Sequence, residues 1–143
     1  GLDVAKIRVG LVLAENGGIL EKITKPISLN MGAALGSGKQ WQSWIHIEDL
    51  AGIFLFAIQI DLTGTYNAVA PNPVTNKELT NQLASKMGKS VWLPNVPSIA
   101  LKTLLGEMSQ IVLSSQLVSC KKIVEQGFNF KYTNLSRALN DLV

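Results

Sequence analysis

The apolar positions in the first third of the chain predict a strand and then a helix. Lys6–Leu13 is a nearly continuous aliphatic run that stops at a Glu-Asn-Gly-Gly turn signal, which is typical of a strand buried on both faces in a parallel sheet. Gly18–Ile27 fits a short helix that Pro26 would end. A glycine-rich turn, Met31–Lys39, and the stretch Gln40–Ile47 come next.

A helix, a strand and a further helix are expected next. Glu48–Ile60 has the length and apolar density of a buried helix, and two carboxylates in its first turn suit the positive end of the helix dipole. Gly64–Val69 is a second strand candidate. Thr75 and Glu78 form a capping box that opens a helix ending at Gly88. Strand, helix, strand and helix in this order predict an α/β doubly wound sheet.

Beyond this point the chain becomes mainly helical. Pro97 suits the first position of a helix over Ser98–Val112. Two shorter helices are expected at Lys121–Gln126 and Leu135–Leu142. A soft boundary near residues 88–96 divides the chain into an α/β part, 1–88, and a small helical part, 89–143.

Composition adds an excess of apolar residues to this picture. Of the 143 residues, 47% are hydrophobic and only 16% are charged, where ordinary soluble domains carry about 25% charged residues. Such a chain either buries an unusually full core or lies against something else. The net charge is +3, but the lysines and arginines are scattered, whereas a nucleic-acid surface clusters them. We therefore expect no nucleic-acid partner.

Cysteine usage and the apolar stretches bear on the compartment. Cys120 is the only cysteine, so the chain forms no internal disulfide, as is usual in a reducing compartment. The longest apolar stretches, Leu50–Ile58 and Pro97–Leu105, fall short of the roughly 20 residues that span a bilayer, and the chain does not open like a signal peptide. We expect a soluble, cytoplasmic protein with no membrane partner.

Three groups of residues suggest catalytic or metal chemistry, and each has a simpler interpretation. Gly36-Ser37-Gly38-Lys39 lacks the earlier glycine and the following Ser or Thr of a phosphate loop, so a glycine-rich turn is favoured. Ser43, His46 and Asp49 straddle a strand-to-helix junction without a nucleophile-elbow pattern. We favour local hydrogen bonding for His46 and a helix-start role for Asp49. A single histidine makes no convincing metal site, so we predict neither catalytic nor metal-binding residues.

Several strings along the chain occur together in one known group of proteins. Their order and joint occurrence are specific, although each string alone is weak. They are Arg8–Leu13 with Gly17-Gly18, Leu35–Gln40, Ser43–Ile47 with Asp49, Tyr66–Pro71, Leu105–Met108 and Gly127–Phe130. With these strings the chain resembles the epimerase-like members of the extended short-chain dehydrogenase family, which carry a small C-terminal domain of unassigned function.

The resemblance implies a fold and an incomplete enzyme. The fold would be the C-terminal portion of a Rossmann-like doubly wound parallel sheet plus a small, mainly helical C-terminal domain. No glycine-rich turn for the cofactor pyrophosphate follows a strand here. Neither Tyr66 nor Tyr132 has the lysine four residues later that the family uses in proton transfer. Both elements would precede this chain in a whole family member, so the chain alone would be inactive.

The resemblance also implies cofactor and substrate residues. The parent protein would bind NADP or NAD and act as an oxidoreductase or epimerase on a small-molecule substrate. Leu11, Val12 and Leu13 would run past the nicotinamide, although burial in a strand explains Val12 equally well. Gln40 and Trp41 would line the substrate cleft. The chain alone should not bind the dinucleotide tightly.

The expected partner follows from the excess of apolar residues. A two-strand remnant of a doubly wound sheet leaves an edge and two apolar faces uncovered. The N-terminal half of the same protein would cover them, or the chain would self-associate. The alternative is a non-enzymatic protein-interaction module, a role suggested by relatives labelled as cell-division inhibitors.

Overall fold

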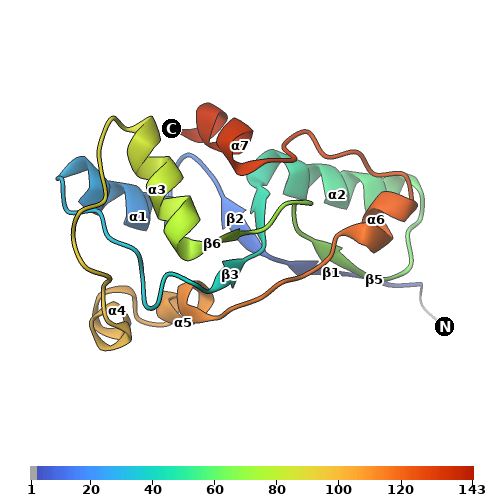
Figure 1. Cartoon of the computed structure of the whole chain (residues 1–143). Helices are drawn as coiled ribbons and strands as arrows, with labels where there is room; N and C mark the ends of the chain where they lie inside the picture. The colour runs from blue at the N-terminus through green and yellow to red at the C-terminus, as the bar shows by residue number, and fades with distance from the viewer. Residues whose placement is uncertain (1–2) are drawn as a thin grey trace.

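The first apolar run forms two short strands in place of one. In the computed structural model, which describes residues 3–143, these are β1 (Ala5–Val9) and β2 (Leu11–Leu13) (Figure 1). β1 pairs in parallel with β5 (Gly64–Ala68), and β2 pairs in parallel with β4 (Trp44–His46). The parallel α/β fold predicted from the sequence is therefore confirmed.

The run changes partner at Gly10. The amide of Gly10 donates to the carbonyl oxygen of Ala68, and the next amide, that of Leu11, donates to Ser43. A Cβ atom on Gly10 would lie 2.3 Å from the Ser43 carbonyl oxygen and 2.6 Å from a methyl carbon of Val69. Only glycine allows the two segments to approach so closely.

The helices of the α/β part follow the predicted order. α1 (Gly18–Ser28) runs two residues past Pro26, so the prediction that this proline ends the helix is wrong. In the last turn a proline removes one amide donor but does not block the residues after it. α2 spans Ile47–Gln59 and α3 spans Asn76–Lys86. The Thr75 hydroxyl accepts from the amide of Glu78 at 3.2 Å, as the capping box predicts.

A third strand pair lies within the first part of the chain, and an isolated bridge connects the first part to the second. β3 (Trp41–Gln42) pairs antiparallel with β6 (Val74–Thr75). Leu35 and Val96 form the bridge. The glycine-rich turn is thus tied directly to the segment that begins the C-terminal part.

The helix predicted over residues 98–112 is two helices. α4 (Ser98–Leu105) ends at Gly106, whose φ of 59° lies in the left-handed region, and α5 (Met108–Leu113) follows. α6 (Lys121–Glu125) and α7 (Leu135–Leu142) match the predicted short helices. Figure 1 shows the C-terminal segment passing from α5 to α6 and then returning along α2 to α7.

The larger hydrophobic core contains side chains from both sides of the predicted boundary. Leu13 and Leu83 from the α/β part pack in the same cluster as Val112 and Leu139. A second cluster joins β5 and α2 to α6, with Ile53 and Ile123 fully buried in it. The division into two units therefore stays a prediction, while the packing across it is extensive.

Helix α2 is not the buried helix that its composition suggested. Asp49 and Ile53 are its buried residues, and one side of it is exposed. Every residue of β1 is likewise at least partly exposed, so its predicted burial on both faces is wrong. In both cases the apolar pattern indicates a surface to be covered, and residues 3–143 do not supply the cover. None of the helices described has the length and apolar character needed to cross a membrane.

Candidate functional site

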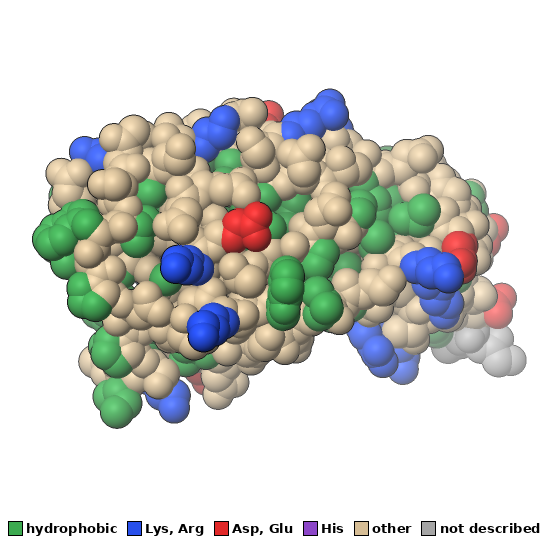
Figure 2. All heavy atoms as spheres, viewed as in Figure 1, with side chains coloured by type: hydrophobic (Ala, Val, Ile, Leu, Met, Phe, Trp, Pro, Cys, Tyr) green, Lys and Arg blue, Asp and Glu red, His purple; other side chains and the backbone are tan. Residues whose placement is uncertain are grey.

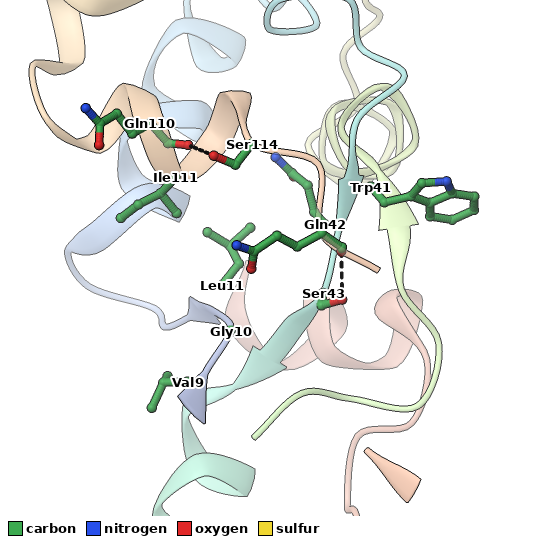
Figure 3. A pocket seen from close by; sticks show the side chains of 10 residues that line it. Val9, Gly10, Leu11, Trp41, Gln42, Ser43, Gln110, Ile111 and Ser114 are labelled. Atoms are coloured by element: carbon green, nitrogen blue, oxygen red, sulfur yellow. Dashed lines mark hydrogen bonds between the residues drawn. The ribbon is translucent and has the colours of Figure 1, made fainter. Parts of the chain in front are cut away.

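A cavity of about 320 Å³ lies at the carboxyl end of β1, where the chain changes partner. This is the place where parallel α/β sheets bind their ligands. Figure 3 shows Ile111 pointing toward Leu11 across the cavity, while the indole of Trp41 extends away from the other side chains. The residues around the cavity come from three segments and are Val9, Gly10, Leu11, Trp41, Gln42, Ser43, Gln110, Ile111, Ser114 and Gln116.

A second cavity of about 220 Å³ adjoins the first. The two share Gly10, Leu11 and Ile111 as lining residues. Val12 and the first residue of α1, Gly18, also line the second cavity. The two cavities are therefore adjacent, and both lie along the end of the first apolar run.

Hydrogen bonds from Ser43 hold the far wall in place. The Ser43 hydroxyl donates to the carbonyl oxygen of Gln116 at 2.9 Å and accepts from the amide of Val118 at 3.0 Å. The amide of Gln116 in turn donates to the carbonyl oxygen of Trp41, and the amide of Trp41 donates to the Ser115 hydroxyl. These bonds align residues 115–118 beside the end of β3 and the start of β4.

Two glutamines beside the cavity differ in how their amides are used. The Gln40 amide nitrogen donates to the carbonyl oxygens of Leu35 and Val112, and its oxygen accepts from the Ser37 hydroxyl. The Gln42 amide nitrogen also donates to Val112, at 3.1 Å. The Gln42 amide oxygen is buried, and no donor reaches it within residues 3–143.

The five residues predicted from the family resemblance are only partly brought together. Leu11 lines both cavities, Val12 lines the second, and Trp41 lines the first. Leu13 is fully buried in the core, and Gln40 is held by its three hydrogen bonds. Neither is among the lining residues, and the ligand contacts of all five stay predictions.

The sequence interpretation missed the wall formed by the C-terminal part. Gln110, Ile111, Ser114 and Gln116 come from α5 and the residues just after it. Their spacing predicts a helix and nothing more. Only the pairing of this segment with Trp41 and Ser43, about seventy residues earlier, places them at the cavity.

Ser43, His46 and Asp49 do not form a catalytic relay. The His46 Nδ1 atom accepts from the amide of Glu48 and caps α2, so the ring proton lies on Nε2, which is 2.9 Å from the Asp141 carboxylate. The Asp49 carboxylate accepts from the amides of Lys131 and Tyr132. The local role favoured for His46 is confirmed. Asp49 lies in the first turn of α2, as expected, and it also anchors the C-terminal segment.

The junction around His46 is stacked and ionic. The Tyr132 ring lies on the His46 ring with centroids 3.8 Å apart. Burial raises the pKa of the Tyr132 phenol, and the carboxylates of Asp141 and Glu48 raise it further. The hydrogen bond and charge of Glu48 raise the pKa of Lys131. None of these groups lines the cavity at β1, so the junction stabilises the fold and takes no part in that site.

The cavity at β1 has polar but uncharged walls. Its lining residues include three amides, two hydroxyls and an indole, and none of them carries a charge. In the part of the chain that the structure describes, no three His, Cys, Asp or Glu side chains gather to hold a metal. The cavity can hydrogen-bond a ligand, but an acid or base for catalysis must come from elsewhere.

Parallel strands joined by helices, with a cavity where the strand changes partner, place the chain in the Rossmann-like α/β class. Residues 96–142 match a family described as a domain of unknown function (DUF1731). The whole chain is 42% identical to an epimerase family protein of Staphylococcus epidermidis and covers 48% of it. An epimerase family protein of Arabidopsis thaliana, an SDR39U1 homolog called chloroplastic, is also 42% identical over 98% of this chain and 40% of its own length.

Solved structures agree with these sequence matches. Human epimerase family protein SDR39U1, crystallised with NADPH, matches 96% of this chain and 47% of its own with a TM-score of 0.88 and 31% identity. A nucleoside-diphosphate sugar epimerase of Corynebacterium glutamicum matches 98% of this chain and 26% of its own, with a TM-score of 0.74 and 31% identity. The chain is related to the epimerase family proteins, corresponds to their C-terminal half and spans about half the length of the curated relatives it matches.

Proposed function

We propose that the chain is part of an NAD(P)-dependent oxidoreductase of the nucleotide-sugar-epimerase type, in which it supplies the strand beside the nicotinamide and one wall of the substrate cleft. The observation that carries this proposal is the pair of adjoining cavities at the end of the first strand, lined by Leu11, Val12 and Ile111. The human relative described with NADPH supports it.

The residues at these cavities suit one end of such a cofactor. Leu11 and Ile111 offer apolar surface for a flat ring, and Gln110 offers an exposed amide. No cationic side chain lines the first cavity, so it does not suit the cofactor's pyrophosphate. A nicotinamide cofactor supplies hydride transfer when bound. The role of these residues is to orient its ring and exclude water.

One feature of the adjoining hollow favours a phosphate-bearing substrate. Gly18, the first residue of α1, lines the second cavity, and the exposed amides at a helix start favour anions. This placement supports a nucleotide-sugar-like substrate. The acid and base for the reaction would come from the other half of the protein.

The remaining half of such a protein is the partner we propose for the exposed apolar surfaces. β1 pairs on one side with β5, and no other strand among the described residues takes its second edge. The stripe along α2, consisting of Ile47, Phe54, Leu55 and Ile58, is exposed. A free strand edge and an uncovered apolar helix face are surfaces that a missing half of the same protein would cover.

Calorimetric titration with NADPH tests the proposal. The product of the complete reading frame should bind NADPH with a micromolar or lower dissociation constant, and residues 1–143 alone at least a hundredfold more weakly, because no glycine-rich turn for the pyrophosphate follows a strand in these residues. Submicromolar binding by the chain alone, or a complete product that does not bind, contradicts the proposal.

A pair of variants of the complete product localises the cofactor. Ile111→Glu places a carboxylate between the two cavities and should weaken NADPH binding about tenfold, since one tenfold step is about 1.4 kcal/mol. Ile99→Glu makes the same change on α4, at an exposed residue outside both cavities, and should leave the affinity unchanged. If both variants changed the NADPH affinity equally, the cavities would not be the cofactor site.

The second candidate function is a non-enzymatic interaction module of the kind suggested by cell-division-inhibitor labels. The exposed stripe on α2 favours it. Scattered lysines and arginines on the face shown in Figure 2 give no sign of a nucleic-acid partner. A complete product that binds a protein partner through α2 but does not bind NADPH would favour this function.

A further inference from the structure

A third cavity, of about 240 Å³, lies between α1 and α4. It shares no lining residue with the two cavities at β1, so the proposed function does not account for it. Two backbone hydrogen bonds of 2.9 Å hold its walls together: the amide of Val96 donates to the carbonyl oxygen of Ala34, and the amide of Gly36 donates to that of Val96. The segment before α4 is therefore fixed against the loop that follows α1.

The cavity has a buried apolar floor and an exposed apolar mouth. Ile23 and Leu101 in its floor are 6% and 2% exposed, whereas Met31 and Leu104 at its mouth are 54% and 74% exposed. Removing apolar surface of this kind from water is favourable. An apolar cavity of about 150 Å³ already binds benzene. The cavity between α1 and α4 therefore has room for an alkyl chain or ring of somewhat greater size.

The charges around the cavity are mostly positive. Lys22 is the only lining residue with a charged side chain, and the other lining residues are all apolar. The segments that form the cavity, 18–35 and 89–105, carry four lysines and one glutamate. None of these lysines forms an ion pair with a residue in 3–143. Because a lysine lines an apolar wall with its methylene groups and keeps its ammonium group in water, the charge of Lys22 is available to an anion at the mouth.

We propose that the cavity between α1 and α4 binds a small amphipathic anion, with an alkyl chain or ring in the cavity and a carboxylate or similar head beside Lys22. A sugar or nucleotide does not suit these walls, because its hydroxyl groups would lose their hydrogen bonds to water without replacement. The surfaces proposed for the missing half, β1 and the C-terminal end of α2, lie at the other end of the molecule (Figure 1). The inference is therefore independent of the proposed function.

Titration with octanoate followed by NMR tests this inference on the ¹⁵N-labelled complete product and on residues 1–143. Octanoate should shift the backbone amides of Ala33, Leu35 and Leu101 with a dissociation constant on the order of 0.1 mM, which is within reach of so small a ligand. The amides of Gly10 and Leu11, at the other cavities, should not shift. Acetate, which has the head without the chain, should shift none of these signals at the same concentration.

Two substitutions at the mouth test the apolar part of the site. Leu104→Glu places a second negative charge where the head of the ligand lies, and should weaken octanoate binding at least fivefold. Ile99→Glu makes the same change on α4 at a residue that is 79% exposed and does not line the cavity, and it should leave the dissociation constant unchanged. Both side chains are exposed to water, so neither change should prevent folding.

Two substitutions on α1 test the charge. Lys22→Met keeps most of the apolar stem and removes the ammonium group. It should weaken octanoate binding by about two- to fivefold, the range of an exposed ion pair, and leave binding of uncharged 1-octanol unchanged. Lys25→Met is the matched control, because Lys25 lies on the same helix but does not line the cavity. Its affinity for both probes should equal that of the unmodified protein.

The outcomes are distinguishable from those of the proposed function. The inference is overturned if octanoate shifts none of the three amides, if acetate shifts them equally, or if Leu104→Glu binds octanoate as Ile99→Glu does. Binding by residues 1–143 but not by the complete product would mean that the other half fills the cavity, and would also overturn it. A complete product that binds NADPH but not octanoate leaves the proposed function standing, and the reverse result affects the proposed function alone.

Discussion

Helix α2 is covered by the C-terminal segment at its first turn and is exposed along its outer side. At its first turn, His46 and Asp49 bond to the C-terminal segment, and Tyr132 stacks on the His46 ring. Along its outer side, Phe54, Leu55 and Ile58 are exposed, with Ile58 at 75%. The C-terminal segment thus covers the start of α2 through directional bonds. The outer side of the same helix is apolar and exposed, and a partner could cover it.

This difference indicates how much each side of α2 contributes to the stability of the chain. Directional bonds fix the position of the C-terminal segment around Lys131, Tyr132 and Asp141. The open side contributes nothing to the stability of the isolated chain, because burial stabilises only where water is removed. Substitutions on the two sides should therefore differ sharply in their effect on the free energy of unfolding, and the following experiments measure that difference.

Asp49→Ala should have the largest effect. It removes the buried carboxylate that accepts from the amides of Lys131 and Tyr132 at 2.8 and 2.9 Å. Losing two bonds to a charged acceptor, with a buried amide left unpaired, should cost about 4 kcal/mol in urea unfolding. Glu48→Gln is the neighbouring control: its carboxylate is half-exposed, where water screens the ion pair, and the loss should be far smaller. Equal losses would mean that the first turn of α2 does not anchor the segment.

Gly10→Ala should follow in size. The new Cβ would overlap the Ser43 carbonyl oxygen and the Val69 side chain, and overpacking of this kind costs about 3 kcal/mol. Gly52→Ala gives the opposite sign, since its Cβ would make ordinary contact with the Phe128 ring at 3.5 Å and a helix gains up to about 1 kcal/mol from alanine. Thermal unfolding of both variants measures the contrast. A tolerated alanine at position 10 would show that the strands can separate there without cost.

Ser43→Ala tests how the cavity wall is attached, and it should lower the free energy of unfolding less than the two previous substitutions. It removes the hydroxyl that bonds Gln116 and Val118 and should destabilise the chain by about 1–2 kcal/mol. Amide hydrogen exchange at residues 115–118 should quicken more than exchange elsewhere. Ser114→Ala removes a hydroxyl bonded within its own helix and should change stability by less than about 0.5 kcal/mol. Unchanged exchange in Ser43→Ala would contradict the anchoring role.

Local signals explain which elements could be predicted from the sequence. The capping box at Thr75 and the helices that begin near residues 18, 48 and 76 depend on neighbouring residues, and they are found close to their predicted places. The strands β3, β4 and β6 were not predicted. The break at Gly10 depends on its approach to Ser43 and Val69, which no local pattern encodes. The break at Gly106 was missed because one glycine is tolerated in a helical pattern.

The candidate site was less predictable than the fold. Leu11, Val12 and Trp41 were proposed by resemblance and lie at the cavities, but their ligand contacts stay predictions. The opposite wall, at Gln110 and Gln116, depends on hydrogen bonds to residues about seventy positions earlier. The exposure of α2 could not be predicted either. An apolar pattern indicates a surface that is to be buried, but it does not show whether this chain or a partner buries it.

The open side of α2 should show the smallest effect on stability and a clear effect on association. Replacing Leu55 and Ile58 together by glutamine should change the free energy of unfolding by less than about 0.5 kcal/mol, because both side chains are already exposed to water. The unmodified chain should self-associate through this surface in sedimentation velocity runs, and the double variant should sediment as a smaller species. Val124→Gln, at an exposed apolar residue of α6, should leave association unchanged. A monomeric unmodified chain that unfolds cooperatively would mean that the open side needs no partner, and the exposed surface of α2 would no longer support a missing half.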